Sequence, residues 1–126
     1  MLEIRPIEEK EKQMALCAAC NVDYNKDALA YGATVDDEFV GICQFGMDDK
    51  YGYIYDLKCV LGKDDFEALF IMGRATLNFI DLCGVHKALY CGEESRLTKA
   101  IGFKKEDGKL IMDLEGFFEN PCKHEK

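Results

Sequence analysis

The chain has 126 residues, with 16 Lys and Arg against 24 Asp and Glu, and a formal net charge of −8. This length suits one domain and is too short for two, and a hydrophobic content of 48% is too high for a disordered acidic tail. The charge argues against a nucleic-acid partner, which needs clustered Lys and Arg, and no apolar run reaches the ~20 residues of a membrane span.

The charged start of the chain and its cysteines indicate a reducing compartment. Charges stand where a signal peptide has its apolar stretch, so we expect a cytoplasmic protein. Seven cysteines in apolar segments do not form a disulfide framework. Cys17 and Cys20, with Cys122 and His124, are a remote zinc alternative because C-x-H is a loose ligand spacing. We therefore expect no metal.

The first elements are a strand and a helix. Residues 2–7 alternate apolar and polar side chains, which predicts a strand, and Pro6 favours an edge position. Residues 8–21 predict a helix that begins with acidic residues. Its helical spacing turns Met14 and Cys17 toward the core.

Three strands follow in a row, over 29–35, 38–46 and 52–60. The first connection is a turn at Asp36-Asp37, and the second is a loop that ends before the third strand. Short connections between neighbouring strands predict an antiparallel meander.

The longest periodic segment is a helix over 64–83. Asp64 and Glu67 form a capping-box-like start, and Gly84 is suited to the position just past the end. Apolar residues recur at helical spacing on one face, while the opposite face, which includes Arg74, is expected to lie in solvent.

The last elements are a strand over 86–91, a short helix over 93–101 and a hairpin over 102–116. Asp107-Gly108 is a strong signal for a two-residue turn in that hairpin. The complete order is β-α-β-β-β-α-β-α-β-β, which predicts an α+β fold with a mixed sheet.

No linker or repeat divides the chain. We expect one domain over 1–116 and a C-terminal tail over 117–126. Phe117 and Phe118 would either cap the core or pack on a second copy, so a homodimer stays an alternative.

Three strings carry a resemblance to a known family. They are EFVGICQF at 38–45, YIYDLKCV at 53–60 and RLTKAIGFKKEDGKLIMDL at 96–114. In sequence and spacing they resemble strands and the closing segment of the GNAT superfamily of acetyltransferases. The resemblance covers the chain from its start to about Gly116. It implies a mostly antiparallel, twisted sheet with helices on both faces.

The resemblance also implies an N-acyltransferase that moves an acyl group from acetyl-CoA or another acyl-CoA to an amine of a small molecule or peptide. Asp56 matches a position that faces the amine, where it would position or deprotonate it. Thr98 stands where the family often has a tyrosine that protonates the thiolate. The positions implied to bind the cofactor are Leu57, Cys59, Val60, Gly62 and Lys63.

Asp56 and the residues before it have a structural alternative. Asp56 is equally well explained as a hydrogen-bonded strand residue, and a partner is expected in either case because buried carboxylates are paired. Tyr51, Tyr53 and Tyr55 share one strand face. They form either cross-strand packing or a pocket wall beside Asp56.

One segment departs from the family pattern. The family's glycine-rich pyrophosphate loop falls on residues 64–69, where Glu67 and Leu69 replace glycines. Asp64, Asp65 and Glu67 would repel a pyrophosphate, and Lys63 is the nearby positive charge. This departure leaves a second function open, a non-catalytic GNAT-fold binding or interaction module that has lost CoA binding.

Overall fold

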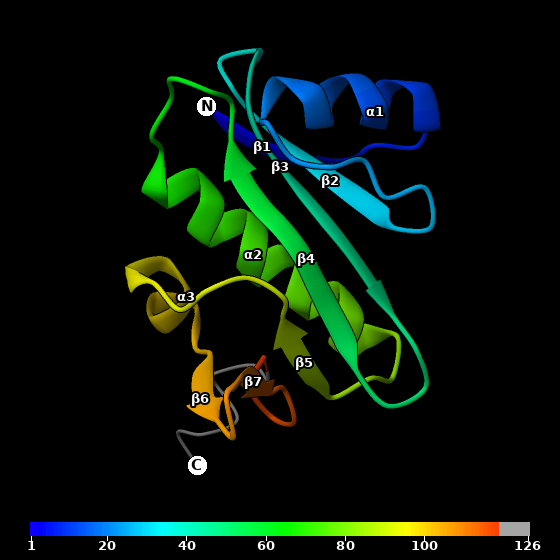
Figure 1. Cartoon of the computed structure of the whole chain (residues 1–126), viewed down its shortest axis with the longest axis vertical. Helices are drawn as coiled ribbons and strands as arrows, with labels where there is room; N and C mark the ends of the chain where they lie inside the picture. The colour runs from blue at the N-terminus through cyan, green and yellow to red at the C-terminus, as the bar shows by residue number, and fades with distance from the viewer. Residues whose placement is uncertain (119–126) are drawn as a thin grey trace.

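The computed structural model describes residues 1–118, which form one sheet and three helices (Figure 1). The strands are β1 (Leu2–Pro6), β2 (Leu29–Val35), β3 (Glu38–Met47), β4 (Gly52–Cys59), β5 (Lys87–Tyr90), β6 (Lys104–Glu106) and β7 (Lys109–Asp113). The helices are α1 (Lys10–Ala19), α2 (Phe66–Leu82) and α3 (Arg96–Ile101). The predicted element order and the α+β class are confirmed.

The sheet has the order β1-β2-β3-β4-β5-β7-β6. The β4–β5 pair is parallel, and every other neighbouring pair of the described strands is antiparallel. β1 lies at the edge, as Pro6 predicts. The meander over β2, β3 and β4 is also confirmed, and with the crossover through α2 it brings β4 beside β5.

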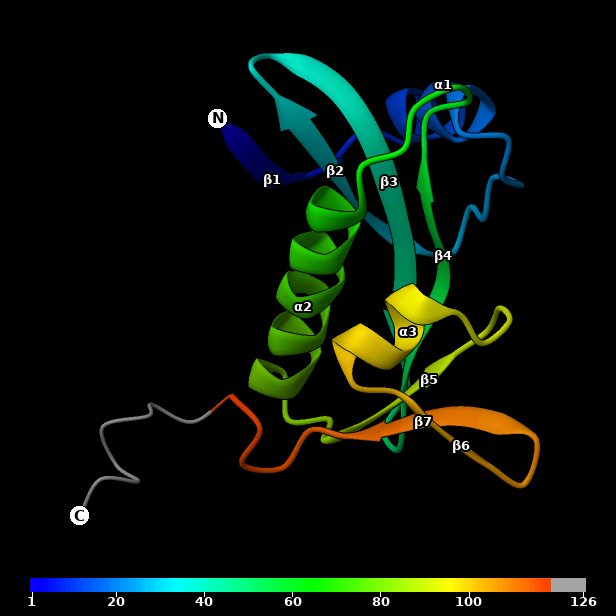
Figure 2. The ribbon, with the colours of Figure 1, turned by 90° about the vertical axis from the view of Figure 1, so that its left-hand side faces the viewer.

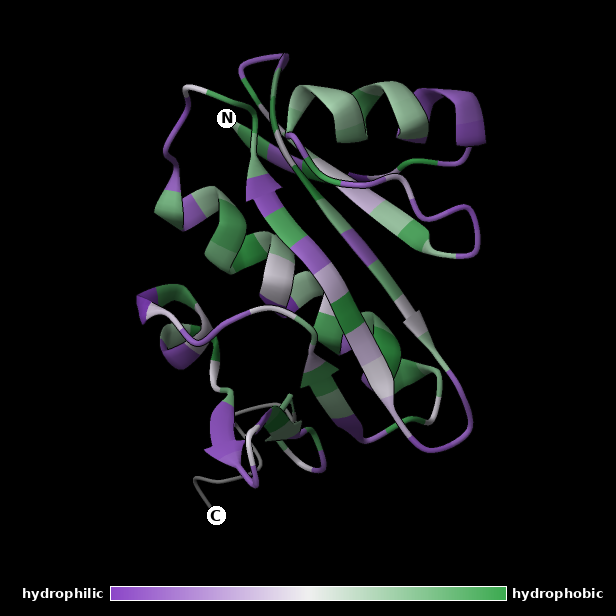
Figure 3. Cartoon of the chain, in the orientation of Figure 1, coloured by the Kyte–Doolittle hydropathy of each residue, from purple (hydrophilic) through white to green (hydrophobic). Residues whose placement is uncertain are grey.

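Helices cover both faces of the sheet. Figure 2 shows α2 on one side and α1 on the other, with α3 against α2. The core under α2 includes Met72, Leu77, Ile80 and Ile54, all fully buried, and each such side chain contributes roughly 1.5–3 kcal/mol. Along β4, hydrophilic and hydrophobic residues alternate (Figure 3), because successive side chains point to opposite faces.

The predicted orientation of α1 is confirmed for Cys17, which is buried, and is wrong for Met14. Met14 is 52% exposed, whereas Gln13 is fully buried beside Cys17. The helix turns Gln13 inward because its amide donates a hydrogen bond to the side-chain oxygen of Gln44 at 2.8 Å. A buried amide with a partner is thus accommodated, and an exposed methionine costs little.

Turns and helix ends follow the sequence closely, with one correction. Asp36-Asp37 and Asp107-Gly108 both have positive φ, as two-residue hairpin turns require. Gly84 lies just past α2 with φ 91°. The helix is capped by Asp65 and not by Asp64.

Arg74 does not lie free in solvent, contrary to prediction. Its Nε donates to the carbonyl of Ile101 at 2.7 Å and ties α2 to the end of α3.

Two predictions depend on the C-terminal residues. Cys122 and His124 lie outside the described residues, as does most of the predicted tail. Within residues 1–118, no group of three or more His, Cys, Asp or Glu side chains is placed to hold a metal ion. None of the helices in this part of the chain is long and apolar enough to cross a membrane.

Candidate functional site

β4 and β5 separate after a short parallel contact. They pair over three residues of each strand and end with Ile54 opposite Tyr90. One further bond runs from the Cys91 amide to the Ile54 carbonyl at 2.9 Å. β4 then continues to Cys59 while β5 has ended, and Figure 1 shows the two strands apart at this level. The sheet therefore has a gap that exposes the backbone of β4.

The backbone groups of Leu57 and Cys59 face this gap. Val60 donates its amide to a carbonyl at the start of β3 at 2.9 Å. Residues of an antiparallel strand turn their backbone groups alternately toward and away from the neighbour. Counting back from Val60, Lys58 also turns toward β3, and Leu57 and Cys59 turn away from it. An unpaired strand edge of this kind binds an extended ligand through main-chain hydrogen bonds.

A β-bulge in β4 fixes this orientation. Phe45 lies opposite Ile54 and Gln44 lies opposite Asp56, so Tyr55 is the extra residue. Because of the extra residue, the backbone groups on the two sides of the bulge no longer follow one alternating pattern toward β3 and away from it. As a result, the Ile54 carbonyl and the Leu57 backbone point to the same side although the residues are three apart.

Tyr51, just before β4, and Tyr53 and Tyr55 within it lie together, as predicted. The ring centroids of Tyr51 and Tyr53 are 6.4 Å apart, and those of Tyr53 and Tyr55 are 6.0 Å apart with nearly parallel planes. Tyr53 donates its hydroxyl to Asp48 at 2.7 Å. The rings pack on one another along one strand, whereas the packing interpretation placed the contacts between neighbouring strands.

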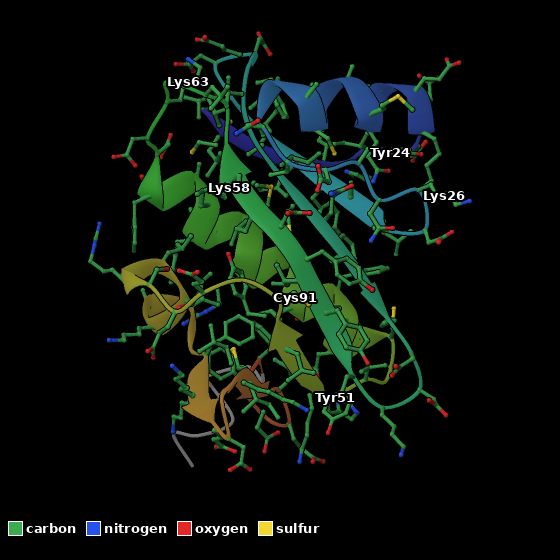
Figure 4. All side chains as sticks on the ribbon, viewed as in Figure 1. Tyr24, Lys26, Tyr51, Lys58, Lys63 and Cys91 are labelled. Carbon is green, nitrogen blue, oxygen red and sulfur yellow. The ribbon has the colours of Figure 1, made fainter. Side chains whose placement is uncertain are left out.

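One of these tyrosines, Tyr53, also borders a pocket of about 710 Å³. Its lining includes Tyr53, Tyr90, Cys91, Glu93, Glu94 and Lys105. Figure 4 shows Cys91 beside the middle of β4, between Tyr51 and Lys58. The pocket therefore adjoins the gap and carries charges of both signs.

Asp56 has the partner that its burial requires. Its Oδ2 accepts a hydrogen bond from the side-chain amide of Gln44 at 2.7 Å. Burial, and to a smaller degree Asp23, raise the pKa of the Asp56 carboxyl, while Gln44 and Lys58 act in the opposite direction. A carboxylate with a raised pKa is a stronger base than one in water.

Thr98 is committed to the start of α3. Its hydroxyl donates to the Ser95 carbonyl at 3.0 Å and accepts from the Ser95 amide at 2.9 Å. The Thr98 amide in turn donates to the Ser95 hydroxyl, which completes a capping box. Thr98 is fully buried. This arrangement offers no proton to the gap, so we leave Thr98 out of the chemistry.

The start of α2 is occupied by the chain's own carboxylate. Asp65 accepts a hydrogen bond from the Ala68 amide at 3.0 Å, and this amide belongs to the helix end that would bind an anion. Asp64 and Glu67 add two exposed negative charges. The residues present do not fit a pyrophosphate bound at this helix end.

Four of the predicted cofactor residues come together next to the same helix end. Cys59, Val60, Gly62 and Lys63 line a pocket of about 330 Å³, whereas the side chain of Leu57 is buried in the core under α2. Gly62 has φ 87°, which lets the chain turn from β4 toward α2.

The positive charge of Lys63 is partly neutralised by a neighbouring carboxylate. Its ammonium bonds to Glu38 at 2.8 Å. A second cation is near, because the guanidinium of Arg96 lies 3.9 Å from the ring centroid of Phe66, the first residue of α2. No local sequence signal points to Arg96, because the contact joins two helices that are far apart in the chain.

Comparison with solved structures identifies the architecture, while no protein-family model and no curated protein matches the sequence. The IAA acetyltransferase from Bacillus cereus ATCC 14579 superposes with a TM-score of 0.71 and 17% identity, over 90% of this chain and 100% of that chain. The chain has the GNAT fold. Two further GNAT-fold structures agree with this assignment.

The first is the ribosomal-protein-S18-alanine N-acetyltransferase from Escherichia coli, with a TM-score of 0.69 and 9% identity over 90% of this chain and 94% of that chain. The second is a GNAT family acetyltransferase from Elizabethkingia anophelis with acetyl-CoA bound, with a TM-score of 0.67 and 14% identity over 90% and 98%. At these identities the likeness establishes the fold, and activity has to be argued from this chain's own residues.

Proposed function

We propose that this GNAT-fold protein transfers an acyl group from acetyl-CoA or another acyl-CoA to an amine of a small molecule or peptide. The observation that carries the proposal is the gap between β4 and β5, where the Leu57 and Cys59 backbone groups lie without a strand partner next to Asp56. The extended arm of the cofactor would bind along these groups. The thioester supplies the activated acyl group.

The chain's own residues would act on the amine. An amine is protonated at neutral pH and reacts only after it loses a proton. Asp56, half-buried and with a raised pKa, is suited to accept that proton. The tyrosines of β4 and the adjoining 710 Å³ pocket would orient the amine and exclude water.

A second function has its own support. Asp65 caps the α2 end and Lys63 is paired with Glu38, so the usual anion site of the fold is filled by the chain itself. These contacts favour a GNAT-fold binding or interaction module that does not use CoA.

Acetyl-CoA binding separates the two functions. Thermal unfolding is measured with and without acetyl-CoA; at a hundred times Kd a ligand adds about 2.7 kcal/mol of stability. No shift in Tm at millimolar acetyl-CoA would rule out the enzyme. Acetyl transfer to a panel of primary amines is then followed by mass spectrometry. A thiol reagent that detects released CoA is unsuitable, because it would also react with the exposed Cys83 and Cys91.

Replacement of the carboxylate tests the mechanism. We expect Asp56→Ala to lower turnover by about tenfold or more, since a general base contributes at least that factor. Asp49→Asn removes an equal charge from an exposed loop and serves as the control. Equal turnover of the Asp56→Ala protein and the control would remove Asp56 from the mechanism.

A further inference from the structure

Two glutamine side chains are fully buried between α1 and the sheet. Gln13 comes from α1 and Gln44 from β3, and both have 0% exposure. A buried amide is stabilised only if its donors and acceptors are paired. The two meet beneath the segment 20–28 that connects α1 to β2.

Every hydrogen-bonding position of the Gln44 amide is used. Its Oε1 accepts from the Asn25 backbone amide at 3.0 Å and from Gln13 Nε2 at 2.8 Å. Its Nε2 donates to the Asp23 carbonyl at 2.8 Å and to Asp56 Oδ2 at 2.7 Å. A backbone amide only donates and a carbonyl only accepts, so the partners allow one orientation of this side chain.

The connecting segment is also held at its far end. Gln13 Nε2 lies 3.3 Å from the Asn25 carbonyl, and Lys10 donates to the Ala28 carbonyl at 2.5 Å. Ala28 is almost completely buried. The segment is therefore held by hydrogen bonds from Lys10, Gln13 and Gln44, and Gln44 also bonds to Asp56.

We propose that Gln44 is a positioning residue that couples the segment 23–25 to the carboxylate of Asp56. One N–H of Gln44 holds Oδ2, and among the described residues no protein group donates to the other oxygen, Oδ1. Oδ1 is thereby left for the amine. Any movement of the segment 23–25 reaches Asp56 through the second N–H of the same amide. The inference rests on the proposed function for the identity of the reacting group.

The surroundings of Asp56 make Gln44 its main source of stabilisation. Among the titratable groups around it, Asp23 and Lys58 act on the pKa of Asp56. The others come from α1, β3, β5 and the residue after β5, and Asp56 helps to raise their pKa: Cys17, Cys43, Tyr90 and Cys91. Burial raises the pKa of the cysteines and the tyrosine, so these groups are neutral near pH 7. Asp23 opposes ionisation of Asp56, and Lys58 is exposed.

The test replaces Gln44 by methionine, which has similar volume and no donor. Titration of the Asp56 carboxyl by ¹³C NMR should give a midpoint at higher pH than in the parent protein, because the carboxylate loses its donor. The acid limb of the pH–rate profile should move the same way, with kcat/KM lower by about tenfold or more.

Gln13→Met is the matched control, because it also removes a buried amide but leaves the bond between Gln44 and Asp56 in place. Both variants should lose thermal stability, while the titration of Asp56 should move only in Gln44→Met. An unchanged titration in Gln44→Met, or an equal shift in both variants, would overturn the proposal.

A reciprocal variant decides the matter if Gln44→Met does not fold. Asp56→Ala leaves one N–H of Gln44 unpaired, and we expect faster hydrogen exchange at the Asn25 amide. An unchanged exchange rate would contradict the coupling. Neither NMR measurement needs an acyl donor, so a failure of the proposed function and a failure of this inference are distinguishable.

Discussion

Asp65 competes with any anion for the start of α2, and its replacement should weaken the fold while it strengthens CoA binding. In Asp65→Ala the Ala68 amide loses its acceptor at 3.0 Å and the helix end loses one negative charge. Loss of an N-cap costs about 1 kcal/mol, which lowers Tm by roughly 3–6 °C for a domain of this size. The freed amide offers a hydrogen bond to a charged ligand worth about 1.5–3 kcal/mol. Affinity for CoA should therefore rise by about tenfold or more.

Calorimetric titration with CoA measures the gain, and two more variants separate its causes. Asp65→Asn keeps a capping side chain and removes the charge. Asp64→Ala removes the neighbouring exposed charge and leaves the cap intact. We expect the largest gain in affinity for Asp65→Ala, a smaller one for Asp65→Asn and the smallest for Asp64→Ala. Only Asp65→Ala should lose the full capping energy.

Pantetheine, which has no pyrophosphate, is the ligand control. Its affinity should be the same in all these proteins. The reasoning is refuted if Asp65→Ala binds CoA no better than the parent protein, or if pantetheine gains as much as CoA.

Two other predictions concern polar side chains near the helix ends. Thr98→Ala and Ser95→Ala each break the capping box of α3, so each should lower the free energy of unfolding by about 1 kcal/mol. The two variants should also change turnover to the same extent, and a loss of turnover in Thr98→Ala alone would show that Thr98 takes part in the reaction. The hydrogen bond to Asp81 raises the pKa of His86, so the protonated pair stabilises the fold below about pH 6.5 and the effect is lost as pH rises through the folded pKa. Thermal unfolding of His86→Gln should differ most from that of the parent protein in this acidic range, and a pH-independent difference would contradict the assignment.

Element order was predictable because each segment carries a local signal. The turn at Asp107-Gly108 and the helix end at Gly84 require positive φ values, and the residue types at these positions are the ones that adopt them most readily. The N-cap of α2 was misplaced by one residue because Asp64 and Asp65 are equally good caps, and only the path of the chain from β4 selects Asp65.

The candidate site was predictable only in part. The position of Asp56 follows from the resemblance of one strand, but its partner does not. Gln13 and Gln44 are 31 positions apart in the sequence. Hydrophobic periodicity predicts that Met14 faces the core, whereas the structure buries Gln13. A polar residue that is stabilised by a distant strand has no local signal.

Thr98 shows the limit of reasoning from position alone. The resemblance located the residue, while the Ser95-x-x-Thr98 spacing already contained the capping signal that explains its burial.

The buried amide of Gln44 also bears on how β3 finds its partners during folding. From Val40 to Phe45 this strand is buried on both faces, so hydrophobic alternation cannot distinguish one strand register from another. A shift of β3 against β4 would move the Gln44 amide away from Asp56, so that one N–H of a fully buried amide and a half-buried carboxylate lose their bond to each other. Mispaired forms of the sheet are thereby made costly. One glutamine in the middle of the chain selects the alignment in which the bulge, and with it the opening in the sheet, forms at the correct position.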